Sequence, residues 1–92
     1  MKTQVLCGRF LKSNGQPFGG EIEFLPVEIG YEEDGIYYAH KAPHMVLEDG
    51  NFSVELDVTE YFVYTPIGRW RVSIKGKDGV GFLSDYLPSR FQ

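Results

Sequence analysis

The sequence predicts an all-β fold: an antiparallel Greek-key β-sandwich of about seven strands, with at most one short helical turn. Residues 51–58 alternate strictly between apolar and polar side chains, and residues 69–75 do the same. Eleven glycines and five prolines divide the rest of the chain into short segments. A period of two with one apolar face indicates strands buried on one side only, and such strands need a second layer to cover them.

Length and composition favour one packed domain over residues 1–92. The chain is 42% hydrophobic and 15% aromatic, which argues against disorder. A domain of this size buries only about two thirds of its unfolded surface, so it has little room for an internal pocket. The net charge of -4 argues against a surface that follows nucleic-acid phosphates.

The single cysteine, Cys7, lies in an apolar run and is expected to behave as a small hydrophobic side chain. The first residues are followed by too short an apolar run for a signal peptide, and no run approaches membrane-spanning length. We therefore expect synthesis in a cytoplasm and no membrane partner.

The first half of the chain contains four expected strand regions. Residues 4–11 form the first, and Asn14-Gly15 supplies the turn after it. Residues 21–26 form the second, which ends at Pro26 because proline lacks a ladder donor. A protruding hairpin is expected over 29–38, with 32–35 as its loop. Residues 44–48 form a short strand that leads into the Asp49-Gly50 turn.

The second half adds the two alternating strands and less regular segments. Residues 57–62 combine capping residues with a possible single helical turn, and 64–68 are expected to be a connection. In the strand over 69–75, the inward positions are Trp70, Val72 and Ile74. Residues 76–79 are expected to be a tight hairpin loop, and a strand to return over 80–87 before Pro88 and the tail at 89–92.

No metal or cofactor site is expected. His40 and His44 are four residues apart, but Pro43 lies between them, so the helical geometry that would join them is absent and both are expected to be exposed loop histidines. The acidic run 32–34 lacks the alternating ligand spacing of a calcium loop.

No catalytic residues are expected either, and an enzyme is the least favoured class. None of the serines lies in a Gly-x-Ser-x-Gly motif. The pairs Glu21/Glu23 and Glu55/Asp57 are expected on open, outward strand faces, which do not shift carboxyl pKa values as a cleft does.

Aromatic and charged side chains are the best candidates for binding. A set of aromatic residues either contacts a partner or covers the ends of a small core: Tyr31, Tyr37, Tyr38, Tyr61, Phe62 and Tyr64. Arg69 and Arg71 either pair with acids on an adjacent strand or bind an acidic partner. Acidic residues cluster in the first half of the chain and basic residues in the second. The simpler interpretation is that these charges lie on solvated strand faces. The alternative is head-to-tail contact between copies, in which an acidic edge meets a basic edge.

The order of motifs resembles a known family. It includes Leu6-x-Gly8-x-Phe10, Asn14-Gly15-x-Pro17, Gly20-x-Ile22-x-Phe24-x-Pro26, residues 48–56 and Trp70-x-Val72-x-Ile74. This pattern is similar to the transthyretin-like (prealbumin-like), Ig-like β-sandwich of carboxypeptidase regulatory-like domains. It is closer to the small modules of that type in tail and decoration proteins of tailed bacteriophages.

The resemblance implies a non-enzymatic structural or binding module of a phage particle, in the tail, neck or capsid decoration. It implies a virion location, with other virion proteins or further copies of the chain, as a homo-oligomer, as partners. We expect contacts through the protrusion at 29–44 and one exposed sheet edge. The candidate contact residues are Tyr31, Glu32, Glu33, Asp34, Tyr37, Tyr38, His40, Arg69 and Arg71.

Two alternatives remain open. The chain could be a small accessory phage protein that binds and inhibits a host or defence factor, with the acids around 32–34 imitating phosphate. It could instead be a carbohydrate-binding module in which Tyr31, Tyr37 and Tyr38 stack on a host-surface glycan.

Overall fold

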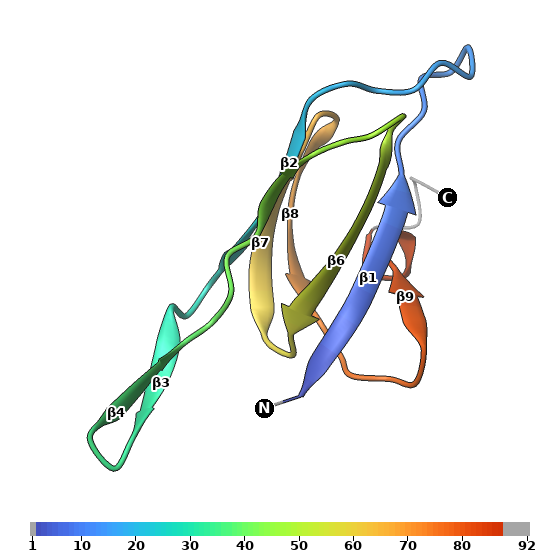
Figure 1. Ribbon diagram of the computed structural model, residues 1–92. Helices are drawn as coiled ribbons and strands as arrows, with labels where there is room; N and C mark the ends of the chain where they lie inside the picture. Colours follow the sequence, from blue (N-terminus) through green and yellow to red (C-terminus); the bar gives the residue numbers. More distant parts are fainter. Residues whose placement is uncertain (1, 88–92) are drawn as a thin grey trace.

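The structure is a computed structural model that describes residues 2–87, and it is nearly all β (Figure 1). In this part of the chain there are nine strands and one 3-10 helix. The strands are β1 (Thr3–Arg9), β2 (Glu21–Pro26), β3 (Gly30–Glu33), β4 (Ile36–Ala39), β5 (His44–Val46), β6 (Asn51–Asp57), β7 (Glu60–Thr65), β8 (Gly68–Ser73) and β9 (Val80–Phe82), and the helix is η1 (Leu83–Asp85). The predicted all-β class is confirmed.

Seven of these strands form a sandwich of two sheets. One sheet has the order β6-β1-β9 and the other the order β5-β2-β7-β8. All pairings are antiparallel except that of β1 with β9, which is parallel. The remaining strands, β3 and β4, pair only with each other and project from one end of the sandwich (Figure 1).

Strand β6 behaves as its alternation predicts. It pairs with β1 along its whole length, and Phe52 and Leu56 are buried between the sheets. The turn before it is tight because Asp49 and Gly50 both have positive φ values, 52° and 78°. Two consecutive positive φ values are typical of a type I′ turn, which the Asp-Gly pair favours. A side chain at Gly50 would also collide with the Phe10 carbonyl oxygen.

The core is a single cluster between the two sheets. The ring of Phe24 lies 5.9 Å from that of Phe52 and meets Tyr61 edge-on at 6.2 Å. Gly8 lies opposite Phe52 in the β1–β6 register, and the Phe52 ring occupies the space above it. The buried hydrophobic residues are Leu6, Phe10, Ile22, Phe24, Leu47, Phe52, Leu56, Tyr61, Val63, Val72, Ile74 and Leu83.

The helical turn predicted for residues 57–62 is wrong. The chain bends at Val58 and Thr59 and then enters β7, which lies between β2 and β8. Tyr61 and Val63 alternate into the core, so burial favours an extended backbone over the local capping signal. The connection expected at 64–68 is correspondingly shorter, because β7 continues to Thr65 and β8 begins at Gly68.

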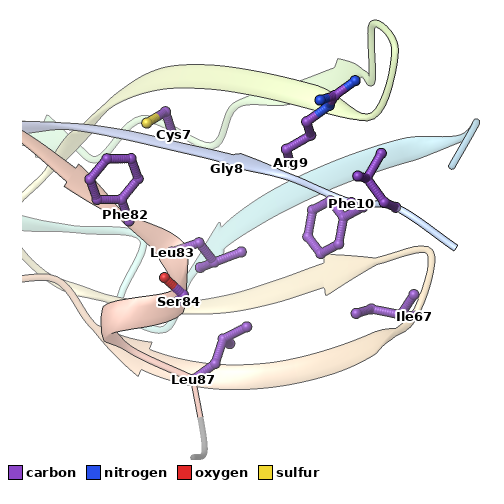
Figure 2. Close-up of a pocket in the computed structure, with 10 residues that line it drawn as sticks. Cys7, Gly8, Arg9, Phe10, Ile67, Phe82, Leu83, Ser84 and Leu87 are labelled. Carbon is purple, nitrogen blue, oxygen red and sulfur yellow. The ribbon is translucent and has the colours of Figure 1, made fainter. Parts of the chain in front are cut away.

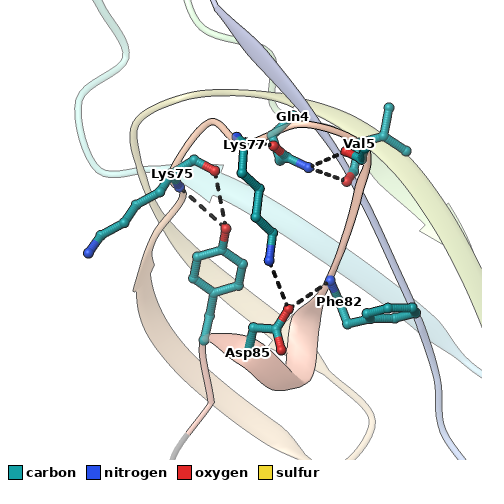
Figure 3. A network of polar contacts seen from close by, with 8 residues as sticks. Gln4, Val5, Lys75, Lys77, Phe82 and Asp85 are labelled. Atoms are coloured by element: carbon teal, nitrogen blue, oxygen red, sulfur yellow. Dashed lines mark hydrogen bonds and ion pairs between the residues drawn. The ribbon is translucent and has the colours of Figure 1, made fainter.

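The hairpin loop predicted at 76–79 is also wrong. These residues carry the chain from β8 in one sheet to β9 in the other, where β9 pairs with β1. The side chain of Gln4, on β1, is hydrogen-bonded to this crossover (Figure 3). Its Oε1 accepts a hydrogen bond from Lys77 N–H at 2.8 Å, and its Nε2 donates to the Gly79 carbonyl at 2.9 Å. Gln4 is 2% exposed.

The strand expected over 80–87 ends at Phe82 and continues as η1, which buries Leu83. Asp85 closes this turn, since its carboxylate accepts a hydrogen bond from Phe82 N–H and pairs with Lys77 at 3.2 Å (Figure 3). These donors hold the Asp85 pKa below its usual value. Pro88 and the tail at 89–92 lie outside the described residues. Within the described range, no helix has the length and apolar character needed to cross a bilayer.

Candidate binding surface on the hairpin arm

The most prominent surface feature is the projecting β3–β4 hairpin with its two flanking residues, Ile29 and His40, which we call the hairpin arm. It turns at Asp34 and Gly35, whose φ values of 52° and 78° repeat those of the Asp49-Gly50 turn. The predicted hairpin is confirmed, but its loop is shorter than expected because Glu33 pairs with Ile36. The molecule measures 53 × 24 × 20 Å, and Figure 1 shows the arm extending its long dimension.

One face of the arm carries a stacked pair of tyrosines. Tyr31 and Tyr38 lie opposite each other in the register, and their rings stack with centroids 5.0 Å apart at 17°. Ile36 and Glu33 continue this face toward the tip, because alternate residues of a strand share a face. The His40 ring lies 5.9 Å from Tyr31 at the base. The stack gives a short hairpin internal order that its backbone bonds alone would not provide.

The other face is hollowed. Gly30 and Ala39 are paired and carry almost no side chain, and beside them Glu32 is paired with Tyr37. The result is a shallow, mainly apolar hollow of about 390 Å³ on the arm. Tyr37 is 85% exposed. Gly30 is required here, since a Cβ at this position would collide with the Tyr38 carbonyl oxygen.

The arm exposes a cluster of large apolar side chains. Its exposed large hydrophobic residues are Ile29, Tyr31, Ile36, Tyr37 and Tyr38. Two-stranded hairpins are marginal in water, and clustered exposed apolar side chains mark interaction sites in soluble proteins. The acids Glu32, Glu33 and Asp34 surround this apolar surface at the tip and are all exposed. The arm thus has an apolar body and an acidic end.

The base of the arm is fixed to the sandwich through Asp57. His40 Nδ1 lies 3.3 Å from Asp57 Oδ2, and the Lys41 backbone N–H donates to the same oxygen at 3.0 Å. The side chains of His40 and Asp57 are 8% and 7% exposed. The expectation of an exposed loop histidine is therefore wrong for His40, whereas His44 is half-exposed beside Glu21.

The outward position predicted for Asp57 is also wrong. It is the last residue of β6, where the returning arm crosses over the strand and covers the carboxylate. Glu55, two residues earlier, is exposed as predicted and pairs with Lys41 Nζ at 3.2 Å. Sequence alternation alone could not separate these two acids, because the covering segment comes from the distant 40–41 region.

Tyr61 lies in the core next to Asp57. Its hydroxyl accepts a hydrogen bond from the Asp57 backbone N–H at 3.1 Å. Burial, and then the negative charge of Asp57, raise the pKa of Tyr61 to about 12. Tyr61 is therefore part of the core and not of a contact surface. Of the two interpretations of the aromatic set, partner contact or core packing, the second holds for this residue.

Replacing Tyr61 with phenylalanine is expected to reduce the loss of stability at alkaline pH. Because the folded pKa lies above the unfolded value, the protonated phenol contributes fully below about pH 10, and this contribution disappears as pH rises through about 12. Between about pH 10 and about pH 12, the free energy of unfolding measured in urea should fall by roughly 2 kcal/mol more in wild type than in Tyr61→Phe. Asp57→Asn, which removes the charge and leaves Tyr61 in place, should give an intermediate result. Equal pH slopes in all three proteins would contradict this assignment.

The structure does not bring the two predicted arginines to the arm. Arg69 and Arg71 lie on the outward face of β8, the edge strand of the four-stranded sheet. Arg71 Nε bonds Glu60 at 2.8 Å, and its guanidinium lies 5.8 Å from the Phe62 ring. With Tyr64 and Trp70 these side chains line a separate hollow of about 180 Å³. The candidate residues thus form two surfaces: the arm and the β8 face.

A third hollow lies between β1, η1 and the β7–β8 turn (Figure 2). It has a volume of about 320 Å³, and Figure 2 shows Phe10, Leu83 and Ile67 around it. Cys7 borders it and is half-buried, in keeping with a small hydrophobic role. Sequence reasoning did not identify this hollow, because its lining comes from three segments that are far apart in the sequence.

Within residues 2–87, no three His, Cys, Asp or Glu side chains gather in a way that would hold a metal ion. Ile29 and Ile36 are exposed contact candidates that sequence reasoning did not single out. The signal available was their place in the predicted hairpin, Ile36 directly after the Asp34-Gly35 turn and Ile29 at the start of the hairpin. Comparison of the sequence with models of known protein families and with curated proteins gave no match.

Proposed function

We propose that this protein is a non-enzymatic binding module that makes protein–protein contacts through the hairpin arm. The observation that carries the proposal is the arm itself: a two-strand projection that exposes five large apolar side chains. Tyrosine combines a large, stiff apolar ring with a polar tip and is enriched at interfaces. A partner that covered the arm would bury this surface and stabilise an element that has no second layer of its own.

The setting we propose is a bacteriophage particle, in which the chain serves as a tail, neck or capsid-decoration component. This part of the proposal rests on the resemblance of the motif order to transthyretin-like modules of tailed phages. A rigid sandwich with a projecting, anchored arm suits such a role, because the arm can reach a neighbouring subunit while the sandwich keeps its own core.

Removing the two most exposed apolar side chains of the β4 strand, Ile36 and Tyr37, is expected to disrupt particle association. The test is a density gradient of particles from cells that produce a phage encoding this chain, with the chain detected by antibody. Wild type should sediment with particles, whereas Tyr37→Ser/Ile36→Ser should remain at the top, with binding reduced at least tenfold. Phe82→Ser, which removes an exposed ring from β9, is the matched control and should sediment as wild type does. Wild-type chain found only at the top of the gradient would contradict a virion role.

A second candidate is carbohydrate binding, which the exposed Tyr37 ring and the adjacent apolar hollow favour. Sugar rings stack on aromatic faces, and Glu32 beside Tyr37 could accept hydroxyl hydrogen bonds. A glycan array separates the two candidates: binding that is lost in Tyr37→Ser would favour a glycan, and an array with no signal would remove this candidate.

A further inference from the structure

The acids of the arm lack partners within the described chain. Glu32, Glu33 and Asp34 are all exposed, and none of them forms an ion pair with another of residues 2–87. Three consecutive negative charges at the tip of a narrow projection repel one another, and opposite charge from outside would relieve that repulsion. Their arrangement therefore favours a partner surface that is basic.

The β8 surface has the complementary character. Arg69 forms no ion pair among the described residues, and Lys75 follows the end of the strand with an exposed side chain. Beside the arginines, Phe62 and Trp70 line the hollow described above, which suits a ring from another molecule. Strand β8 is also the end of its sheet, so within the described residues its outer backbone edge pairs with no strand. Such an edge is open to strand addition.

The arm cannot reach this surface within one molecule. It leaves the sheet beyond Pro26, at the end of β2 where Tyr61 pairs with both Pro26 and Val72. Arg69 pairs with Tyr64 toward the other end of the same sheet. The arm points away from the sandwich along the long axis (Figure 1). The acidic and basic surfaces therefore lie on different parts of an elongated molecule.

We propose that the partner of the arm is a second copy of this chain, and that the arm of one copy docks on the β8 edge of the next. This inference rests on the proposed function, because it assumes that the arm is the contact element. In the contact, the acids of the arm face Arg69, the aromatic side chains meet at the β8 hollow, and an arm strand extends the four-stranded sheet. The two surfaces differ, so the contact is heterologous and repeats head to tail into a ring or a filament.

The test is the native mass of the purified protein by analytical ultracentrifugation over a range of protein concentrations and salt. Wild type should associate at low salt and dissociate as salt rises, because exposed charge pairs are screened. Charge reversal on either surface, Glu32→Arg/Glu33→Arg or Arg69→Glu, should weaken association at least tenfold. Glu48→Arg is the matched control: it reverses an exposed charge away from both surfaces and should associate as wild type does.

Mixing the two reversed proteins gives the sharper result. The Arg69→Glu chain keeps an intact arm, and the Glu32→Arg/Glu33→Arg chain keeps an intact β8 surface, so the mixture should form complexes although each protein alone is monomeric. Failure of the mixture to associate, or a wild-type oligomer unaffected by either reversal, would overturn the head-to-tail contact. A wild-type monomer at every concentration would also overturn it. If that monomer still sedimented with particles through its arm, the proposed function would stand and only the partner would be wrong.

Discussion

Replacing Gln4 with leucine is expected to lower the free energy of unfolding by about 3 to 5 kcal/mol, a large share of the stability of a small domain. The Gln4 amide makes three hydrogen bonds at 2.8 to 2.9 Å, to Lys77 N–H and to the carbonyl oxygens of Val5 and Gly79. Leucine is similar in size but pairs with none of these groups, so three partly buried backbone polar atoms lose their partners. Each such loss costs about 1 to 3 kcal/mol.

Urea denaturation of the purified variants measures this effect. Gln4→Glu is informative because its carboxylate can still accept from Lys77 N–H but would face two carbonyl oxygens, so it should also be strongly destabilised. Thr3→Val is the matched control on the same strand: it removes only an exposed bond to Glu55 and should change stability by less than about 0.5 kcal/mol. If Gln4→Leu cost no more than Thr3→Val, the crossover between the sheets would not depend on this side chain.

Replacing Asp57 with alanine is expected to cost about 2 to 4 kcal/mol and to loosen the base of the hairpin arm. The carboxylate holds the Lys41 backbone N–H and the His40 ring, and both contacts lie at the point where the arm joins the sandwich. Removing it leaves a partly buried donor without its acceptor. Amide protons in β3 and β4 should then exchange faster than those of the core strands.

A double-mutant cycle isolates the pair. His40→Ala and Asp57→Ala should be non-additive, because each removes the same 3.3 Å contact. Glu55→Ala is the control: it breaks the exposed contact with Lys41 and should cost no more than about 1 kcal/mol. Additive effects of His40→Ala and Asp57→Ala, with unchanged exchange in the arm, would show that the arm is held in another way.

Several elements follow directly from local sequence. The alternation of Phe52 and Leu56 determines which side of β6 is buried, because neighbouring strand side chains point to opposite faces. The Asp34-Gly35 and Asp49-Gly50 pairs place two tight turns, since aspartate and glycine both tolerate positive φ. The hairpin arm was predictable for the same reason, with strand-forming residues on each side of an acidic turn.

The errors occur where distant contacts outweigh local signals. Residues 57–62 carry helix-capping residues, yet Tyr61 and Val63 are both buried from β7, which pairs with β2 and β8, and an extended backbone places two such alternate residues on one face. The glycines at 76–79 suggest a hairpin, but β9 pairs with β1, and Gln4 from the start of the chain holds the loop. Neither partner is close in sequence, so no local pattern indicates them.

By itself, the sequence determined that this protein is all-β, where its apolar faces lie and where its tightest turns occur, because these depend on periodicity and on backbone preferences of single residues. Only the tertiary structure decided which strands pair, that His40 and Asp57 are buried together, and that Arg69 lies apart from the acids of the arm. These features depend on contacts between segments distant along the chain. The burial of polar side chains such as His40 and Asp57, and the distances between charged groups, arise only when such segments are brought together, so they have no signature in a local stretch of sequence.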